Sequence, residues 1–434
     1  MEMPIQTTQK NSKALHSDNF KKLKKRYVQV RRQTENICNP LKTEDYVIQT
    51  MPNVSPTKWH LAHTSWFFET FILSEYIANY SSYHPRFAYL FNSYYVQAGE
   101  RHCRPKRGLI SRPTVHEVYD YRKYIDEQML SLLENPKTDD TQRLYEVIEI
   151  GLNHEQQHQE LMITDIKHVF SMNPLYPAYQ DRAIELSDHV YDLKWVTFDE
   201  GIYEVGHNGN GFSFDNELPR HKTYIQPFKL ANRLVTNAEY LEFMNAGGYD
   251  RAELWLSDGW DVVKNEQWKS PYYWEKREDE WWIITLQGPR KINPAEPVCH
   301  VSHYEADAFA RWSGSRLPTE FEWEIASDHV PIEGNFVEQK QFHPIPLKSS
   351  SSNSLNQLFG DVWEWTQSAY LPYPGYQPLP GALGEYNGKF MANQMVLRGG
   401  SCATPISHIR NTYRNFFHPD SRWQFTGIRL ANNL

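Results

Sequence analysis

The stretch Asn153-His154-Glu155-Gln156-Gln157-His158-Gln159-Glu160 organises the N-terminal half of this chain. Its two histidines are four residues apart within residues 141–170, where apolar side chains recur at helical spacing. Because an α-helix turns once every ~3.6 residues, positions i and i+4 share a face and both imidazoles can reach one point. This geometry suits a metal ion, although two solvated or capping histidines would show the same spacing. A metal site therefore requires a further ligand from another part of the chain.

Length and composition describe an ordinary globular protein. The 434 residues suggest two or three domains, and 40% are hydrophobic and 23% charged. A net charge of −8 without a basic stripe argues against a nucleic-acid or membrane partner. Widely spaced cysteines, no signal peptide and no run of about 18 apolar residues favour a cytoplasmic location. The oligomeric state cannot be read from these features.

Four helical patterns occupy the N-terminal half, at residues 18–37, 56–80, 113–133 and 141–170. The second pattern begins with Ser55-Pro56, which predicts an N-cap hydroxyl followed by a proline at the first helical position. Four helices in succession indicate a four-helix bundle, and bundles commonly hold metals on inward-facing side chains.

His63 is the candidate for the third ligand. It shares a largely aromatic helix face with Trp59, Trp66 and Phe67, so that face is expected to point inward. A buried core histidine is the alternative interpretation, and His60 is the rival ligand. Three neutral imidazoles would leave coordination positions open, as catalysis requires.

The loop at residues 91–108 is unusually basic and rich in tyrosine. Arg104 and Arg107 can hold a carboxylate, because guanidinium groups pair with carboxylate oxygens in a bidentate fashion. Tyr94 and Tyr95 can donate a proton near a metal. A solvated basic loop with packed tyrosines is the simpler alternative.

The C-terminal half has a different character. Helical periodicity stops before a predicted linker at 176–191, and short β-prone segments follow at 195–198, 201–206 and 224–225. Helices are expected at 236–246, behind an N-cap threonine, and at 304–313. These features predict a mixed and irregular domain.

Five ordered blocks in this half resemble the formylglycine-generating-enzyme (sulfatase-modifying factor) superfamily, which implies a C-type-lectin-like core. The resemblance covers most of residues 192–434. This chain lacks the redox cysteine pair expected of those enzymes, since only Cys402 lies near the corresponding position. We therefore do not expect this domain to oxidise cysteines of other proteins. The blocks are Val301–Trp312, Arg316–Glu324, Gly360–Thr366, Leu397–Ser401 and Gly427–Leu430.

The N-terminal half resembles the DinB-like bundles, whose members bind a metal through three histidines. A fusion of the two domains resembles the sulfoxide synthases of ergothioneine biosynthesis, which use iron(II) and O2 to join a thiol to hercynine. The expected fold is α+β. It comprises a DinB-like four-helix bundle at 15–175 with the iron site, the linker at 176–191, and at 192–434 an irregular C-type-lectin-like domain that completes the substrate pocket.

The resemblance also implies roles for single residues. His63, His154 and His158 would bind Fe(II). Arg104 and Arg107 would hold the carboxylate of the thiol substrate. Gln157 and Asn415 would position hercynine, and one of the tyrosines, Tyr94 or Tyr95, would be the proton donor. Some family members carry an aspartate near the trimethylammonium group of hercynine, whereas this chain offers aromatic faces for a cation–π contact, at Phe416, Phe417 and Trp423.

The resemblance implies cysteine or γ-glutamylcysteine as the thiol donor, and Phe417 together with the tyrosine pair resembles the branch that uses free cysteine. Three alternatives remain open. A related synthase could act on histidine, as in ovothiol formation, or on a selenosugar. A DinB-type enzyme could transfer thiols with zinc. A lectin-like binding module without catalysis would not need three histidines.

Overall fold

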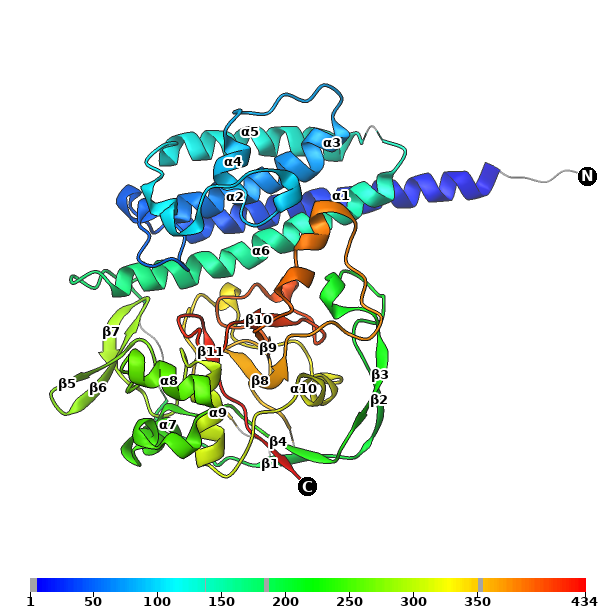
Figure 1. Cartoon of the computed structure of the whole chain (residues 1–434). Helices are drawn as coiled ribbons and strands as arrows, with labels where there is room; N and C mark the ends of the chain where they lie inside the picture. The colour runs from blue at the N-terminus through cyan, green and yellow to red at the C-terminus, as the bar shows by residue number, and fades with distance from the viewer. Residues whose placement is uncertain (1–5, 137, 183–186, 350–353) are drawn as a thin grey trace, which may run out of the picture. The chain divides into compact units, whose positions relative to one another are not determined.

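The structure is a computed structural model that describes residues 6–136, 138–182, 187–349 and 354–434, with side chains described from residue 18 onward. The chain forms two compact units, residues 1–169 and 170–434, which are described separately (Figure 1). Residues 183–186 of the expected linker lie outside the described residues. The expected domain limits at 175 and 192 stay a prediction.

The first unit is helical, as predicted. The four expected helical patterns correspond to long helical segments, and the second continues through a π-helical turn at Glu69–Leu73. The helices are α1 (Gln6–Cys38), α2 (Thr57–Phe68), α3 (Ser74–Tyr76), α4 (Phe87–Phe91), α5 (Val115–Glu134) and α6 (Thr141–Ser171). Among the described residues, none of these helices is long and apolar enough to cross a membrane.

The N-terminal ends of helices α5 and α2 are capped in different ways. At α5, Thr114 accepts a hydrogen bond from the backbone of Glu117, whose carboxylate accepts one from the backbone of Thr114. At α2 the expectation of an N-cap hydroxyl was wrong. Pro56 is the N-cap, and Ser55 makes tertiary contacts instead: its N–H donates to Asp165 and its hydroxyl accepts from Arg107.

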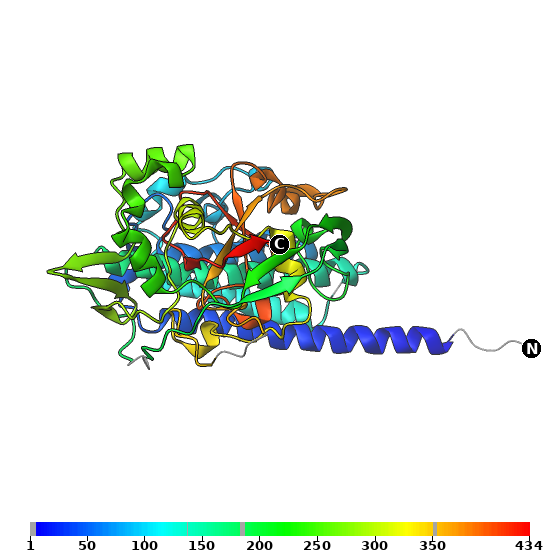
Figure 2. The same cartoon turned by 90° about the horizontal axis from the view of Figure 1, so that it is seen from below.

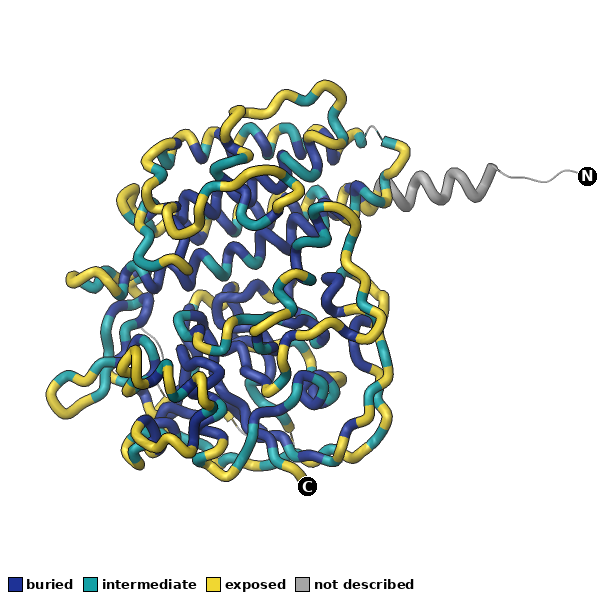
Figure 3. Tube along the Cα trace, in the orientation of Figure 1, coloured by how far each residue is buried: buried dark blue, intermediate teal, exposed yellow. Residues whose placement is uncertain are grey.

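Helix α2 lies in the interior of the bundle. All twelve of its residues are buried, and most of α6 is buried as well (Figure 3). Gly151 of α6 permits close packing of these two helices, because a Cβ atom there would lie 2.8 Å from Phe68 and 2.9 Å from Phe67. The close approach of the two histidine-bearing helices therefore requires a glycine at position 151.

A buried charge cluster joins three helices of the bundle. Glu155 of α6 accepts hydrogen bonds from Arg31 of α1 at 2.9 Å and from Arg122 of α5 at 2.6 Å. Thr34 donates to the same carboxylate at 2.6 Å. Because all four groups are buried, each depends on its partners for the hydration it has lost.

The second unit is rich in short strands, and its described residues form four sheets. Their strand orders are β1-β4-β12, β2-β3, β5-β6-β7 and β10-β9-β8-β11. Among the strands that the structure describes, β8 and β11 form the one parallel pair. Figure 2 shows β12, at the C-terminus, beside β4. The strands are β1 (Trp195–Phe198), β2 (Gly201–Val205), β3 (His221–Ile225), β4 (Phe228–Ala231), β5 (Trp274–Arg277), β6 (Glu280–Thr285), β7 (Gly288–Lys291), β8 (Trp363–Ala369), β9 (Met395–Arg398), β10 (Asn415–Phe417), β11 (Thr426–Gly427) and β12 (Ala431–Asn433).

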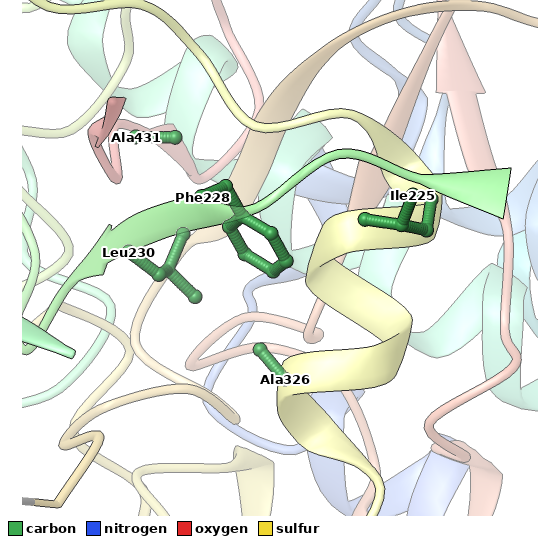
Figure 4. Close-up of a cluster of buried hydrophobic side chains, with 5 residues drawn as sticks. All are labelled: Ile225, Phe228, Leu230, Ala326 and Ala431. Carbon is green, nitrogen blue, oxygen red and sulfur yellow. The ribbon is translucent and has the colours of Figure 1, made fainter. Parts of the chain in front are cut away.

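In the described part of this unit, four α-helices accompany the sheets: α7 (Asn237–Asn245), α8 (Ser257–Asn265), α9 (His303–Trp312) and α10 (Glu320–Ser327). The predicted helices at 236–246 and 304–313 correspond to α7 and α9, and the N-cap role of Thr236 is confirmed. Figure 4 shows a core cluster to which α10 contributes Ala326 and β4 contributes Phe228 and Leu230. The mixed content of the chain confirms the α+β class.

Candidate metal centre

Helix α2 holds His63 between aromatic neighbours. Trp59, four residues earlier, and Trp66, three residues later, both stack on the imidazole, with ring centroids 4.6 and 5.3 Å away. The Nδ1 atom of His63 lies 2.6 Å from the carbonyl oxygen of Phe91. A carbonyl only accepts hydrogen bonds, so Nδ1 carries the proton and Nε2 is the bare nitrogen.

The bare nitrogen of His63 faces the histidine pair of α6. Its Nε2 lies 3.1 Å from Nε2 of His154, and the ring centroids of His63 and His154 each lie 4.6 Å from that of His158. One nitrogen from each of the three rings falls within 4.8 Å of the others. The structure thus brings together all three histidines singled out in the sequence.

Burial keeps these imidazoles neutral. It lowers the pKa of His154 to about 3 and the pKa values of His63 and His158 well below their ordinary range. The mutual repulsion of the rings in their charged forms acts in the same direction for His63 and His158. A neutral imidazole is the form that binds a metal.

The donor set fits a divalent first-row transition metal. The Nε2 atoms of His63 and His154 lie 3.1 Å apart, and the one on His63 carries no proton. A cation about 2.1 Å from each nitrogen would satisfy both. Three nitrogen ligands leave positions for other molecules, unlike the closed four-ligand shell of a structural site.

His60, the rival ligand, lies beside the cluster. Its Nδ1 is 2.8 Å from Nδ1 of His158, and its Nε2 is 2.9 Å from the carboxylate of Asp165. Both of its ring nitrogens are therefore engaged away from the meeting point of the other three histidines.

The two arginines of the basic loop differ in their settings. Arg107 is buried, stacks on Trp59 with its Cζ atom 3.3 Å from the ring centroid, and donates from Nη1 to Ser55. Its Nε has no partner among the described residues. Burial, and then the charge of Arg104, lower the pKa of Arg107. Arg104 is more exposed than Arg107 and donates to the carbonyl oxygen of Asn53.

The tyrosine pair adjoins the aromatic wall of the site. Tyr95 is fully buried and stacks on the half-buried Tyr94, with centroids 4.6 Å apart. It also contacts Trp66, the residue stacked on His63, at 5.7 Å. Gln157 is half-buried on α6, whereas His154 and His158 are buried.

The remaining predicted site residues belong to the second unit. Asn415, Phe416 and Phe417 form β10 and are all half-buried. Phe416 stacks on Tyr370 at 4.1 Å, and Phe417 meets Trp423 edge-on at 6.4 Å. The start of β10 is fixed by Arg414, which donates to both carboxylate oxygens of Glu320.

Two groups near the metal centre could not be identified from the sequence. The pairing of Asp165 with His60 depends on how α2 and α6 pack. The arginines that hold Glu155 come from helices far away in the sequence. The only sequence signal for either group was a charged residue on a predicted buried helix face.

Comparisons with known proteins agree with this architecture. The family model described as "Sulfatase-modifying factor enzyme 1-like domain" matches residues 193–335 and 331–434, and the "DinB superfamily" model matches residues 26–162. The hercynine oxygenase of Mycobacterium tuberculosis is 31% identical over 307 residues, which cover 66% of this chain and 71% of that protein.

Two further relatives are similar over part of their length. The hercynine oxygenase of Mycolicibacterium smegmatis is 34% identical over 245 residues, or 50% of this chain and 56% of that protein. The formylglycine-generating enzyme of Streptomyces coelicolor is 30% identical over 283 residues, or 52% of this chain and 84% of that enzyme. The match thus spans little more than half of the M. smegmatis protein.

The fold and the three-histidine cluster define a DinB-type bundle joined to a sulfatase-modifying-factor-like domain. Within that class, the chain belongs to the hercynine oxygenase family and is an oxygenase. The resemblance noted in the sequence is thereby confirmed.

Proposed function

We propose that this protein is an iron(II)-dependent, O2-dependent sulfoxide synthase that joins hercynine to cysteine, or to γ-glutamylcysteine, in ergothioneine biosynthesis. The observation that carries the proposal is the buried cluster of His63, His154 and His158 in a chain of this family. Iron(II) bound by three neutral imidazoles supplies a redox-active centre with positions left for substrates. The balanced reaction combines an imidazole C–H, a thiol S–H and O2 to give a C–S bond, a sulfoxide oxygen and water.

Arg107 is the proposed anchor of the thiol substrate. Its buried positive charge has no carboxylate partner among the described residues, and its Nε donor is unused. A substrate carboxylate would satisfy both the charge and the donor, in the bidentate geometry that guanidinium groups favour. Arg104, three residues earlier and more exposed, would contribute long-range attraction and a second donor.

The tyrosines are the proposed source of a proton. Tyr95 lies one aromatic ring away from His63, through Trp66, and Tyr94 covers the face of Tyr95. Proton delivery from a phenol as oxygen is reduced would favour sulfoxide formation with C–S coupling over plain oxidation of the thiol.

Hercynine is the proposed second substrate. Gln157, which is half-buried and precedes the proposed ligand His158 in the chain, would hydrogen-bond to hercynine. We also propose Asn415 as a residue that binds hercynine. Phe416, Phe417 and Trp423 would meet the trimethylammonium group through cation–π contacts. Because Phe417 together with Tyr94 and Tyr95 resembles the branch of the family that uses free cysteine, cysteine is the thiol donor that we favour.

The decisive test is a competition among substrates. Protein loaded anaerobically with Fe(II) is mixed with hercynine, histidine, cysteine, γ-glutamylcysteine and a selenosugar under 18O2, and the products are identified by mass. A hercynine–cysteine sulfoxide that carries one labelled oxygen is expected. A product that contains histidine or the selenosugar would show that the protein acts on that substrate instead of the proposed one. Thiol transfer with zinc and no O2 consumption would remove the oxygenase mechanism.

A further inference from the structure

A chain of hydrogen bonds runs from the metal cluster to a buried carboxylate. His158 contacts Nδ1 of His60 through its own Nδ1 at 2.8 Å, and Nε2 of His60 contacts Oδ2 of Asp165 at 2.9 Å. The same oxygen of Asp165 accepts the backbone N–H of Ser55 at 2.8 Å. The three side chains are buried, with exposed fractions of 8% for His158, 3% for His60 and 4% for Asp165.

The acceptor at the end of the chain fixes the direction of every bond. Oδ2 of Asp165 already accepts the backbone N–H of Ser55, and as an acceptor toward His60 as well it requires the proton of a neutral His60 to lie on Nε2. The Nδ1 atom of His60 is then an acceptor, and the Nδ1 atom of His158 must carry the proton that it receives. His158 is left with a bare Nε2, which is the nitrogen that a metal needs.

We propose that His60 and Asp165 are positioning residues that set the tautomer and ring orientation of the metal ligand His158. This proposal rests on the proposed metal-binding role of the three histidines. Neither residue needs to touch the metal or a substrate. Asp165 orients His60, and His60 holds the ring of His158 so that Nε2 is presented beside the nitrogens of His63 and His154.

The test uses Co(II) binding by the full-length protein, without substrates or O2. Affinity is measured by competition with a chromophoric chelator, and ligand geometry is measured from the visible absorption of the bound ion. Because no turnover is involved, failure of the proposed reaction would leave this measurement unaffected. Circular dichroism and thermal unfolding of each metal-free variant report separately on folding.

Substitutions at His60 distinguish the position of its hydrogen-bond acceptor from the volume of its side chain. The amide of His60→Asn lies near the position of Nδ1 and can still accept from His158, whereas the amide of His60→Gln lies near Nε2. We expect His60→Asn to bind Co(II) within about threefold of the native protein, and His60→Gln and His60→Phe to bind roughly 10 to 100 times more weakly with altered absorption.

Asp165→Leu is expected to weaken binding by a similar factor. His168→Phe is the matched control, since His168 is a buried histidine of α6 whose Nδ1 contacts Thr50 at 2.6 Å. Its Co(II) affinity should equal that of the native protein. Native affinity in both His60→Phe and His60→Gln would overturn the proposal. If His60→Phe does not fold, equal affinities of His60→Asn and His60→Gln would overturn it.

Discussion

Two of the three proposed metal ligands are oriented through the ring nitrogen that faces away from the cluster. For His63 the partner is the backbone carbonyl of Phe91, and for His158 it is His60. A carbonyl is part of the main chain and cannot be removed by substitution, whereas a side chain can. The two ligands should therefore differ in their sensitivity to mutation of the surrounding residues.

Arg107→Lys should weaken binding of the thiol substrate. Lysine lacks the Nε–H that has no partner among the described residues, and it lacks the planar group that stacks on Trp59. We expect KM for the thiol to rise roughly tenfold to a hundredfold with little change in kcat. Steady-state kinetics at saturating hercynine measure this split. Arg101→Lys in the same loop is the control, and an unchanged KM in Arg107→Lys would remove its role as anchor.

The double substitution Tyr94→Phe and Tyr95→Phe should change the product. Without a phenol to deliver a proton, oxidation of the thiol competes with C–S coupling, so the yield of cysteine sulfinate should rise about tenfold relative to sulfoxide. Product masses give the ratio directly, and the single variants identify which hydroxyl matters. Because phenylalanine preserves the stacking of the two rings, an unchanged ratio would exclude both hydroxyls as donors.

At the scale of helices, the centre depends on how α1, α5 and α6 are joined beside it. The Glu155 carboxylate follows directly after the ligand His154 and is held by Arg31 and Arg122. These two charges, acting against burial, lower the pKa of Glu155 to about 2 from an ordinary 4.5. The cluster therefore fixes the rotation of α6 about its axis, and with it the direction of His154.

Glu155→Gln should destabilise the bundle in a pH-dependent manner. The lowered pKa contributes roughly 3 kcal/mol to the free energy of unfolding above pH 4.5, and this contribution disappears as the pH falls from 4.5 toward 2. Denaturant unfolding followed by far-ultraviolet circular dichroism at pH 7, 5, 4 and 3 measures the difference between native protein and variant. A difference that stays constant across this range would contradict the assignment.

The elements that could be predicted are those with local signals. The spacing of His154 and His158 placed them on one helix face, and the threonine at 236 marked a helix start that the structure confirms. The predicted N-cap role of Ser55 was wrong, because this serine makes tertiary hydrogen bonds instead. The helix α8 was not foreseen. Its nine residues lie among loops and give too short a periodic signal to be recognised.

At the scale of the whole molecule, the proposed residues fall into two groups. All proposed metal ligands and their outer partners belong to residues 1–169, and the aromatic residues proposed for hercynine belong to residues 170–434. The aromatic residues of the second group were identified from the family resemblance alone, because the residue types in β10 do not by themselves indicate a binding site. His60 and Asp165 could not be suggested, since their pairing arises only from the register between two helices.

Asn415→Ala tests whether the second unit takes part in the reaction. We expect KM for hercynine to rise at least about tenfold, because losing the hydrogen bonds of this half-buried amide to a ligand should cost roughly 1 to 3 kcal/mol. Co(II) affinity and KM for cysteine should stay unchanged, which distinguishes a substrate contact from general damage. Asn393→Ala serves as a surface control in the same unit. An unchanged KM for hercynine in Asn415→Ala would remove this residue from the site.

The hydrogen bonds that hold His63 and His158 also bear on how the protein acquires its metal. The rings are already oriented by protein groups, so loading needs little ordering of the ligands. Neutral imidazoles bind nickel, copper and zinc more tightly than ferrous iron, and the donor atoms alone do not reject those ions. The metal found in a given preparation should therefore follow supply and timing in the producing cell. Mis-metallation of fully folded protein is then the first cause to examine when purified material turns over slowly.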